Sequence, residues 1–193
     1  MLTFAIMKRC RFAIGLLVAL LLIPSVRATQ FIPLNIEDLA ARSQLILRGT
    51  VQSKTCLRDD TGRICTRIQF QVAEAWKGAV PTNVFTIVQS GGVLGEERVA
   101  VSGQAEFRVG EEVVAFLVLN QRGEGVILGL AQGKFDVWQD PQTGERFARN
   151  LFHGGPPPAV SGGKGVAPSA PRVPSNWRLK LSDLKARVQA ARQ

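Results

Sequence analysis

Two segments with strict apolar–polar alternation, separated by a short polar turn, constrain the fold of this chain more than any other feature. One lies in residues 44–55 and the other in residues 63–76. Their apolar phases contain Leu45, Leu47, Gly49, Val51 and Ser53 in the first and Ile64, Thr66, Ile68, Phe70 and Val72 in the second. A period of two is typical of β-strands with one buried face. Because Gly62 in the turn tolerates a positive φ, the two segments are predicted to form a β-hairpin.

The rest of residues 29–152 continues with short apolar segments joined by glycine-containing turns. A short helix capped by Asn35 is predicted first. Further strands are predicted at 83–89, 98–102, 112–119, 125–130, 133–139 and 145–151. Many short strands and few helices indicate one all-β domain with minor α content, folded as an antiparallel barrel or sandwich.

The last predicted hairpin has a register that the sequence fixes. A four-residue loop from Pro141 to Gly144 places Trp138 opposite Phe147. The same loop places Asp136 opposite Arg149.

Cys56 and Cys65 flank the turn of the first hairpin. With the turn centred between Asp60 and Thr61, the two cysteines face each other on the outer side of the hairpin. An even pair of cysteines in an oxidising compartment usually forms a disulfide. Zinc needs about four ligands, and a catalytic redox pair has the pattern Cys-x-x-Cys. We therefore predict a structural disulfide, no metal site and no cofactor.

Residues 1–28 have the layout of a secretory signal peptide. Lys8, Arg9 and Arg11 precede the apolar run Phe12 to Ile23, and a small-residue site ends at Ala28. The run is shorter than the roughly twenty residues that cross a bilayer as a helix. Export to the periplasm or the exterior, with cleavage after Ala28, is predicted; an uncleaved anchor is the alternative.

The net charge of +9 is unevenly distributed along the chain. The leader contributes four basic residues and no acid, and residues 159–193 contribute seven basic residues against one acid. Residues 29–158 are therefore close to neutral. This part of the chain lacks the basic surface that binds nucleic-acid backbones, so no nucleic-acid partner is expected.

The C-terminal part is predicted to be a linker followed by a basic helix. Residues 153–176 are rich in glycine and proline, a composition typical of disordered linkers. In residues 177–193, Ser182 is expected to cap a helix with Leu184, Val188 and Ala191 on one stripe. So short a helix is marginal alone. It either docks on the barrel or a membrane, or frays; a weakly ordered tail is favoured, and a weak contact with anionic lipid is the alternative.

Four stretches carry a resemblance to known families. They read SQLILRGTV, TRIQFQVAEAWKG, GGVLGEERVAVSGQAEFRVGEEVVAFLV and VILGLAQGKFDV. This pattern resembles uncharacterised exported bacterial β-domains and, more remotely, the netrin-like OB barrel of tissue inhibitors of metalloproteinases. The resemblance covers about residues 40–138 and implies a small antiparallel OB-like or netrin-like barrel. In those inhibitors an N-terminal cysteine chelates the protease zinc, whereas Thr29 begins the mature chain predicted here.

No catalytic residue is predicted. The adjacent acids Asp59-Asp60, Glu96-Glu97 and Glu111-Glu112 lie beside turns, where solvated charges are expected. The segment GGVLGEE lacks the Lys-Ser/Thr of a P-loop. His153 has no nucleophile-elbow serine to complete a triad.

Three aromatic residues are candidate ligand contacts: Trp76, Trp138 and Phe147. Packing of the tryptophans under the N-terminal helix or the tail is the alternative. The chain is expected to be a non-enzymatic exported binding or accessory module, with another exported protein or envelope component as partner. The alternative function is modulation of a secreted metalloprotease, as an inhibitor or a pro-segment-like partner.

Overall fold

The computed structural model describes residues 32–155 and 178–191. The predicted leader and residues 156–176 of the predicted linker lie outside these residues.

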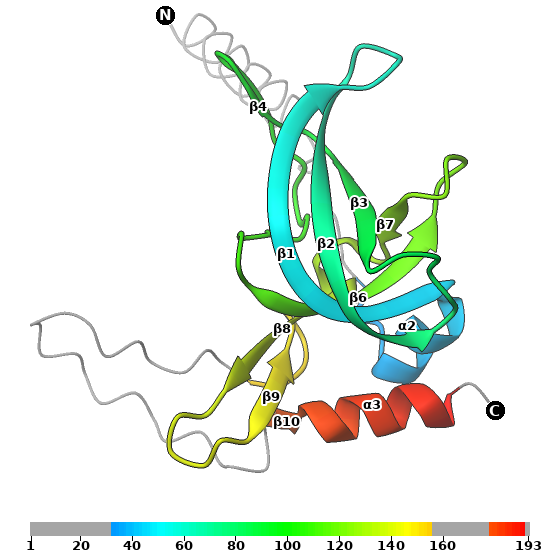
Figure 1. Ribbon diagram of the computed structural model, residues 1–193, viewed down its shortest axis with the longest axis vertical. Helices are drawn as coiled ribbons and strands as arrows, with labels where there is room; N and C mark the ends of the chain where they lie inside the picture. The colour runs from blue at the N-terminus through cyan, green and yellow to red at the C-terminus, as the bar shows by residue number, and fades with distance from the viewer. Residues whose placement is uncertain (1–31, 156–177, 192–193) are drawn as a thin grey trace, which may run out of the picture. The chain divides into compact units, whose positions relative to one another are not determined.

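Five strands close into a barrel, which confirms the predicted fold class. They are β1 (Leu45–Arg58), β2 (Ile64–Lys77), β3 (Val84–Ser90), β6 (Glu112–Leu119) and β7 (Gly125–Ile127). The order is β1-β2-β3-β7-β6, and β6 pairs back onto β1 (Figure 1). All contacts are antiparallel except that between β3 and β7, where Ile87 pairs with Gly125 in parallel. This arrangement is an OB-like barrel.

The remaining elements extend or cover the barrel. Strands β8 (Lys134–Gln139), β9 (Arg146–Arg149) and β10 (Leu179–Lys180) continue the sheet beyond β6. Strands β4 (Gly92–Leu94) and β5 (Glu97–Val99) form a separate hairpin, and the short 3₁₀ helix η1 (Leu130–Gly133) precedes β8. Helices α2 (Ile36–Arg42) and α3 (Leu181–Ala190) lie side by side (Figure 1). The sequence analysis missed β4 and β10.

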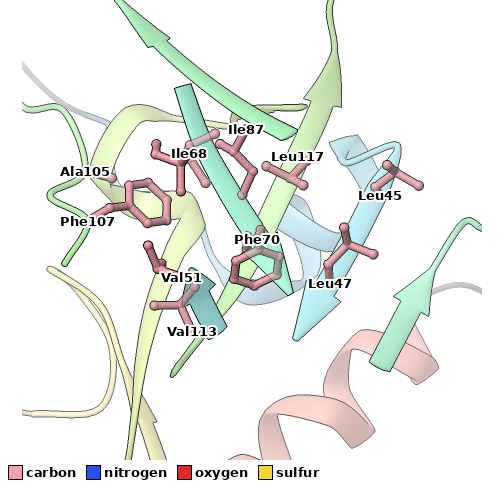
Figure 2. Packing of buried hydrophobic residues seen from close by; sticks show 12 residues of the cluster. Leu45, Leu47, Val51, Ile68, Phe70, Ile87, Ala105, Phe107, Val113 and Leu117 are labelled. Carbon is pink, nitrogen blue, oxygen red and sulfur yellow. The ribbon is translucent and has the colours of Figure 1, made fainter. Parts of the chain in front are cut away.

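The interior of the barrel is filled by the apolar phases identified in the sequence. Leu47, Ile68 and Phe70 are fully buried and point inward with residues of β3 and β6 (Figure 2). Ala105 and Phe107, from the segment before β6, belong to the same core. Both predicted inner faces are thus confirmed as far as Val51 in β1.

A second core lies on the outer side of the barrel wall, beneath α2 and α3. Its buried members are Ile36, Leu39, Ala40, Ile46, Trp76, Val114, Phe116, Phe135, Ala148, Leu184 and Val188. Strands β1 and β6 therefore carry buried residues on both faces, as the unbroken apolar run from Val113 to Leu117 reflects. The two helices are part of the folded domain.

The β1–β2 hairpin departs from its predicted register near the turn. Val51 pairs with Phe70, as the apolar phases predict, but Gln52 forms a bulge and Ser53 then pairs with Gln69. The turn loop has three residues, Asp60 to Gly62, and Gly62 has a φ of 81°. This loop sets the pairing near the turn one residue out of step with the Val51–Phe70 pair, and the bulge at Gln52 accommodates the difference.

The predicted opposition of the two cysteines is wrong because of this bulge. Cys56 pairs with Thr66, and Leu57 pairs with Cys65. Since directly paired residues share a face, Cys56 and Cys65 point to opposite faces of the hairpin. Both are free thiols in the structure, so the predicted disulfide is not formed.

The other local predictions have mixed outcomes. Asn35 caps α2 through its side-chain oxygen, which accepts from the backbone N–H of Asp38 at 2.6 Å, as predicted. The last hairpin has the predicted register, with Trp138 opposite Phe147. Ser182 does not cap α3, which begins one residue earlier at Leu181. The favoured expectation of a weakly ordered tail is also wrong, since Leu184 and Val188 are fully buried.

Candidate functional site

Trp76 is not placed to contact a ligand. Its side chain is 3% exposed and packs in the second core beneath α2 and α3. Its indole Nε1 donates to Glu74 Oε2 at 2.8 Å. Trp76 therefore packs under the helices, which was the alternative interpretation of this residue in the sequence analysis.

Trp138 and Phe147 lie together on the β8–β9 hairpin. Their rings stack with centroids 5.7 Å apart. Phe147 is buried, and Arg178 lies over its ring at 5.6 Å. Trp138 is half-buried and lies beneath Arg149. These two aromatic residues consolidate the hairpin and the attachment of the tail, and Trp138 alone keeps a partly open surface.

A polar groove of about 490 Å³ crosses the β2–β3 face of the barrel. One wall is the β1–β2 turn, and the other is the turn between β6 and β7. The floor comes from β2 and β3. Residues from all four parts line it: Leu57, Arg58, Asp59, Asp60, Thr61, Arg63, Cys65, Arg67, Val88, Gln89, Ser90, Asn120, Gln121, Arg122, Glu124 and Val126.

The β1–β2 wall is organised by Asp59. Its carboxylate accepts from the backbone N–H groups of Thr61 and Arg63, each at 2.9 Å, and from the Thr61 hydroxyl at 2.6 Å. The hydroxyl of Thr61, followed by the Arg63 N–H, lowers the pKa of Asp59 to about 2. The carboxylate therefore stays charged, and the turn keeps a fixed shape against the groove.

The β6–β7 wall is organised by Asn120. Its side-chain oxygen accepts from the N–H groups of Arg122 and Glu124, each at 2.9 Å. Glu124 in turn forms an ion pair with Arg67 of β2, at 2.9 Å between Nη2 and Oε1. Arg122 forms an ion pair with Asp60 on the opposite wall. The two turns are thus connected across the groove and along its floor.

The floor between the two walls contains two buried side chains, Gln89 and Cys65. Gln89 is buried and donates to the carbonyl of Ala105 at 2.8 Å. Cys65 is 8% exposed, and burial raises the pKa of its thiol. A neutral, buried thiol at this position packs as a small apolar group.

A larger hollow of about 690 Å³ lies between the segment before β6 and residues 149–155. Its buried lysine, Lys134, is fully engaged in ion pairs with Glu111 at 2.8 Å and Asp136 at 2.6 Å. The His153 ring lies tilted against that of Phe135, with centroids 5.9 Å apart, and its Nδ1 donates to Asn150 Oδ1 at 3.0 Å. His153 therefore belongs to the folded domain, although the sequence analysis placed it in the linker.

The adjacent acid pairs are more engaged than the sequence analysis expected. Glu112 binds Arg48 at 2.5 Å and also contacts Arg146, while its neighbour Glu111 binds Lys134. These two are partly buried partners of arginine and lysine, which corrects the prediction of solvated turn charges. Within residues 32–155 and 178–191, no cluster of three or more His, Cys, Asp or Glu side chains is arranged to hold a metal.

Sequence reasoning did not identify the groove. Its walls come from turns far apart in the chain, 58–63 and 120–124, which meet because β6 and β7 close the barrel between β3 and β1. The strand order was the missing information. The sequence identified residues 120–124, with glycine at 123, as a turn, but not as a wall of the groove.

No protein-family model and no curated protein matches this chain. In the described part of the chain, no helix has the length and apolarity needed to span a membrane.

Proposed function

We propose that this chain is an exported, non-enzymatic binding module whose groove on the β2–β3 face takes an extended segment of another exported or envelope protein. The observation that carries the proposal is the position of the groove. OB barrels bind linear ligands across strands two and three, between the loop that joins strands one and two and the loop that joins strands four and five. The groove lies between the corresponding turns, 58–63 and 120–124.

The lining chemistry supports a polypeptide rather than a nucleic acid or a sugar. Among the described residues that line the groove, none is aromatic, so it lacks the stacking platforms that bases and sugar rings use. It contains four arginines, each paired with an acid, together with side-chain amides and hydroxyls, so it presents both donors and acceptors to a polypeptide backbone. An extended segment with polar side chains fits this surface.

Capture from an envelope extract tests the proposal. We expect wild-type protein to retain a specific polypeptide, and Arg67→Glu or Arg122→Glu to reduce its recovery at least about tenfold, because each reversal places an acid in the groove. Arg108→Glu is the matched control, since Arg108 lies outside the groove and pairs only weakly with Glu106. If wild type and all three variants retain the same amount of the polypeptide, as quantified by mass spectrometry, the groove is not the binding site.

The alternative function, modulation of a secreted metalloprotease, rests on the sequence resemblance. The same extract distinguishes it. A captured polypeptide with chelator-sensitive protease activity that declines when this chain is added would favour modulation. A captured polypeptide without such activity would favour the accessory role.

A further inference from the structure

The C-terminal segment 178–191 docks on the barrel domain as a peptide ligand would. Leu179 and Lys180 form β10, which pairs with Ala148 and Phe147 at the edge of β9. Leu184 and Val188 of α3 are fully buried in the second core. Addition of a strand to a sheet edge and insertion of an amphipathic helix into a groove are two general modes of peptide recognition. This segment combines both.

The charges of the segment match those of its docking site one for one. Its four described basic residues before Ala191 each form an ion pair with an acid of the barrel domain. The pairs are Arg178–Asp140 at 3.2 Å, Lys180–Glu145 at 2.5 Å, Lys185–Glu74 at 2.8 Å and Arg187–Glu37 at 2.6 Å. The acids come from the β8–β9 loop, β2 and α2. The site therefore selects a basic segment of this spacing.

Two of these pairs are exposed to solvent. Arg187 binds both carboxylate oxygens of Glu37, and the two side chains are 42% and 48% exposed. Lys180 and Glu145 are similarly exposed, at 48% and 40%. Exposed pairs contribute little to stability. By contrast, Glu74 also bonds Arg48 and Trp76, so it has a structural role as well.

We propose that this docking site also binds residues 178–191 of a second copy of the chain, so that two copies exchange their C-terminal segments reciprocally. The identical segment is the one partner certain to match every ion pair and both apolar contacts. Residues 156–177 connect it to the domain, and a chain of that length spans at most about 70 Å when extended. That reach exceeds the size of one small barrel.

Mass action sets when the exchange occurs. A covalent tether of this length holds the chain's own segment at an effective concentration of about millimolar. Binding within one copy therefore dominates in dilute solution, and exchange increases as the concentration of the chain approaches this effective concentration. Reciprocal exchange gives a symmetric dimer with two copies of the same interface.

Complementary charge reversal tests the exchange in full-length chains. The tail variant is Lys180→Glu with Arg187→Glu, and the site variant is Glu37→Arg with Glu145→Lys. In each variant alone, the tail and the docking site of one chain carry like charges. In a mixture, the tail of each variant carries the charge opposite to that of the other variant's docking site. At about 100 µM, below the effective concentration of the tether, we expect a 1:1 heterodimer by native mass spectrometry and sedimentation. Its association should be at least about tenfold stronger than self-association of either variant.

The quadruple variant, with all four substitutions in one chain, is the matched control. It restores charge matching within one copy, so its self-association should equal that of the wild type at the same concentration. A mixture that stays monomeric while both variants keep native near-ultraviolet circular dichroism would overturn the proposal. So would binding of the site variant's released tail to phosphatidylglycerol vesicles in place of heterodimer formation. If a double variant fails to fold, Arg187→Glu mixed with Glu37→Arg provides the same comparison.

Discussion

At the residue scale, Gly49 shows how closely the two long strands approach. A Cβ atom at this position would lie 2.0 Å from the carbonyl oxygen of Gln71 and 2.9 Å from its carbonyl carbon. The neighbour is backbone in the centre of the barrel wall, which cannot move aside as a flexible side chain does. Glycine is therefore required here by space and not by φ.

We predict that Gly49→Ala destabilises the protein by about 3 kcal/mol, because the strands must separate or bend to admit the methyl group. Gly95→Ala is the control. Gly95 has a φ of 62° and no atom within 4 Å of the added Cβ, so only the left-handed backbone opposes alanine, at about 1 kcal/mol. Urea unfolding measures the unfolding free energy of both variants. Equal decreases in the two variants would contradict the close approach of β1 and β2 at Gly49.

At the element scale, the β1–β2 hairpin determines the state of the cysteines. The bulge at Gln52 places Cys56 and Cys65 on opposite faces, so a disulfide would require a shift of register. We predict that Cys56 and Cys65 are both free thiols in the folded domain. Cys65 should react slowly with iodoacetamide, since it is buried and its pKa is raised by burial.

The stability of Cys56→Ser gives an independent check on the same hairpin. With no disulfide to remove, we expect the substitution to change the unfolding free energy by less than about 1 kcal/mol. Loss of a native disulfide from a small domain typically costs about 2–5 kcal/mol. A loss of that size, together with no titratable thiol in the unreduced, unfolded protein, would show that the hairpin has the unbulged register.

Attachment of α3 should depend on pH through Glu74. Hydrogen bonds from Lys185 and then Trp76 lower the pKa of Glu74 to about 2, from an ordinary value of 4.5. The unfolded chain therefore binds more protons than the folded protein in this interval, and stability declines as the pH falls from about 4.5 towards 2. Above pH 4.5 the contribution of this carboxylate is complete.

We predict that Glu74→Gln lowers the thermal midpoint at pH 7, and that its difference from wild type narrows as the pH falls below 4.5. The substitution keeps the shape of the side chain but removes the charge that binds Lys185 and Arg48. Glu96→Gln, at an exposed turn position, should leave the midpoint near wild type at every pH. If the difference in thermal midpoint between Glu74→Gln and wild type stays constant from pH 7 to pH 2, the pKa of Glu74 is not lowered in the folded protein.

At the scale of the whole molecule, the sequence predicted what local patterns specify. The β8–β9 register followed from its four-residue loop, and the inner faces of β1 and β2 followed from alternation as far as Val51. The bulge at Gln52 leaves no such pattern, because the residues that follow it, 53–55, are polar and exposed. Sequence alternation alone therefore gave the wrong partner for Cys56.

Long-range closure was beyond the sequence alone. The pairing of β6 with β1 and the parallel contact of β3 with β7 bring distant turns together and create the groove. Burial of Trp76 depends on α3, which packs on the second core through Leu184 and Val188 and whose segment 178–191 also forms ion pairs with α2, β2 and the β8–β9 loop. Such contacts join segments from 38 to 150 residues apart, and neither periodicity nor turn chemistry encodes them.

The central claim is that the groove between the two turns holds a polypeptide partner. Photo-cross-linking from single positions tests it most directly, with a benzophenone amino acid in place of Gln121, which lines the groove, or in place of Arg108, which does not. In envelope extract we predict one dominant cross-linked product from position 121 and none from position 108. A product from position 108 with none from position 121 would place the partner elsewhere and contradict the account.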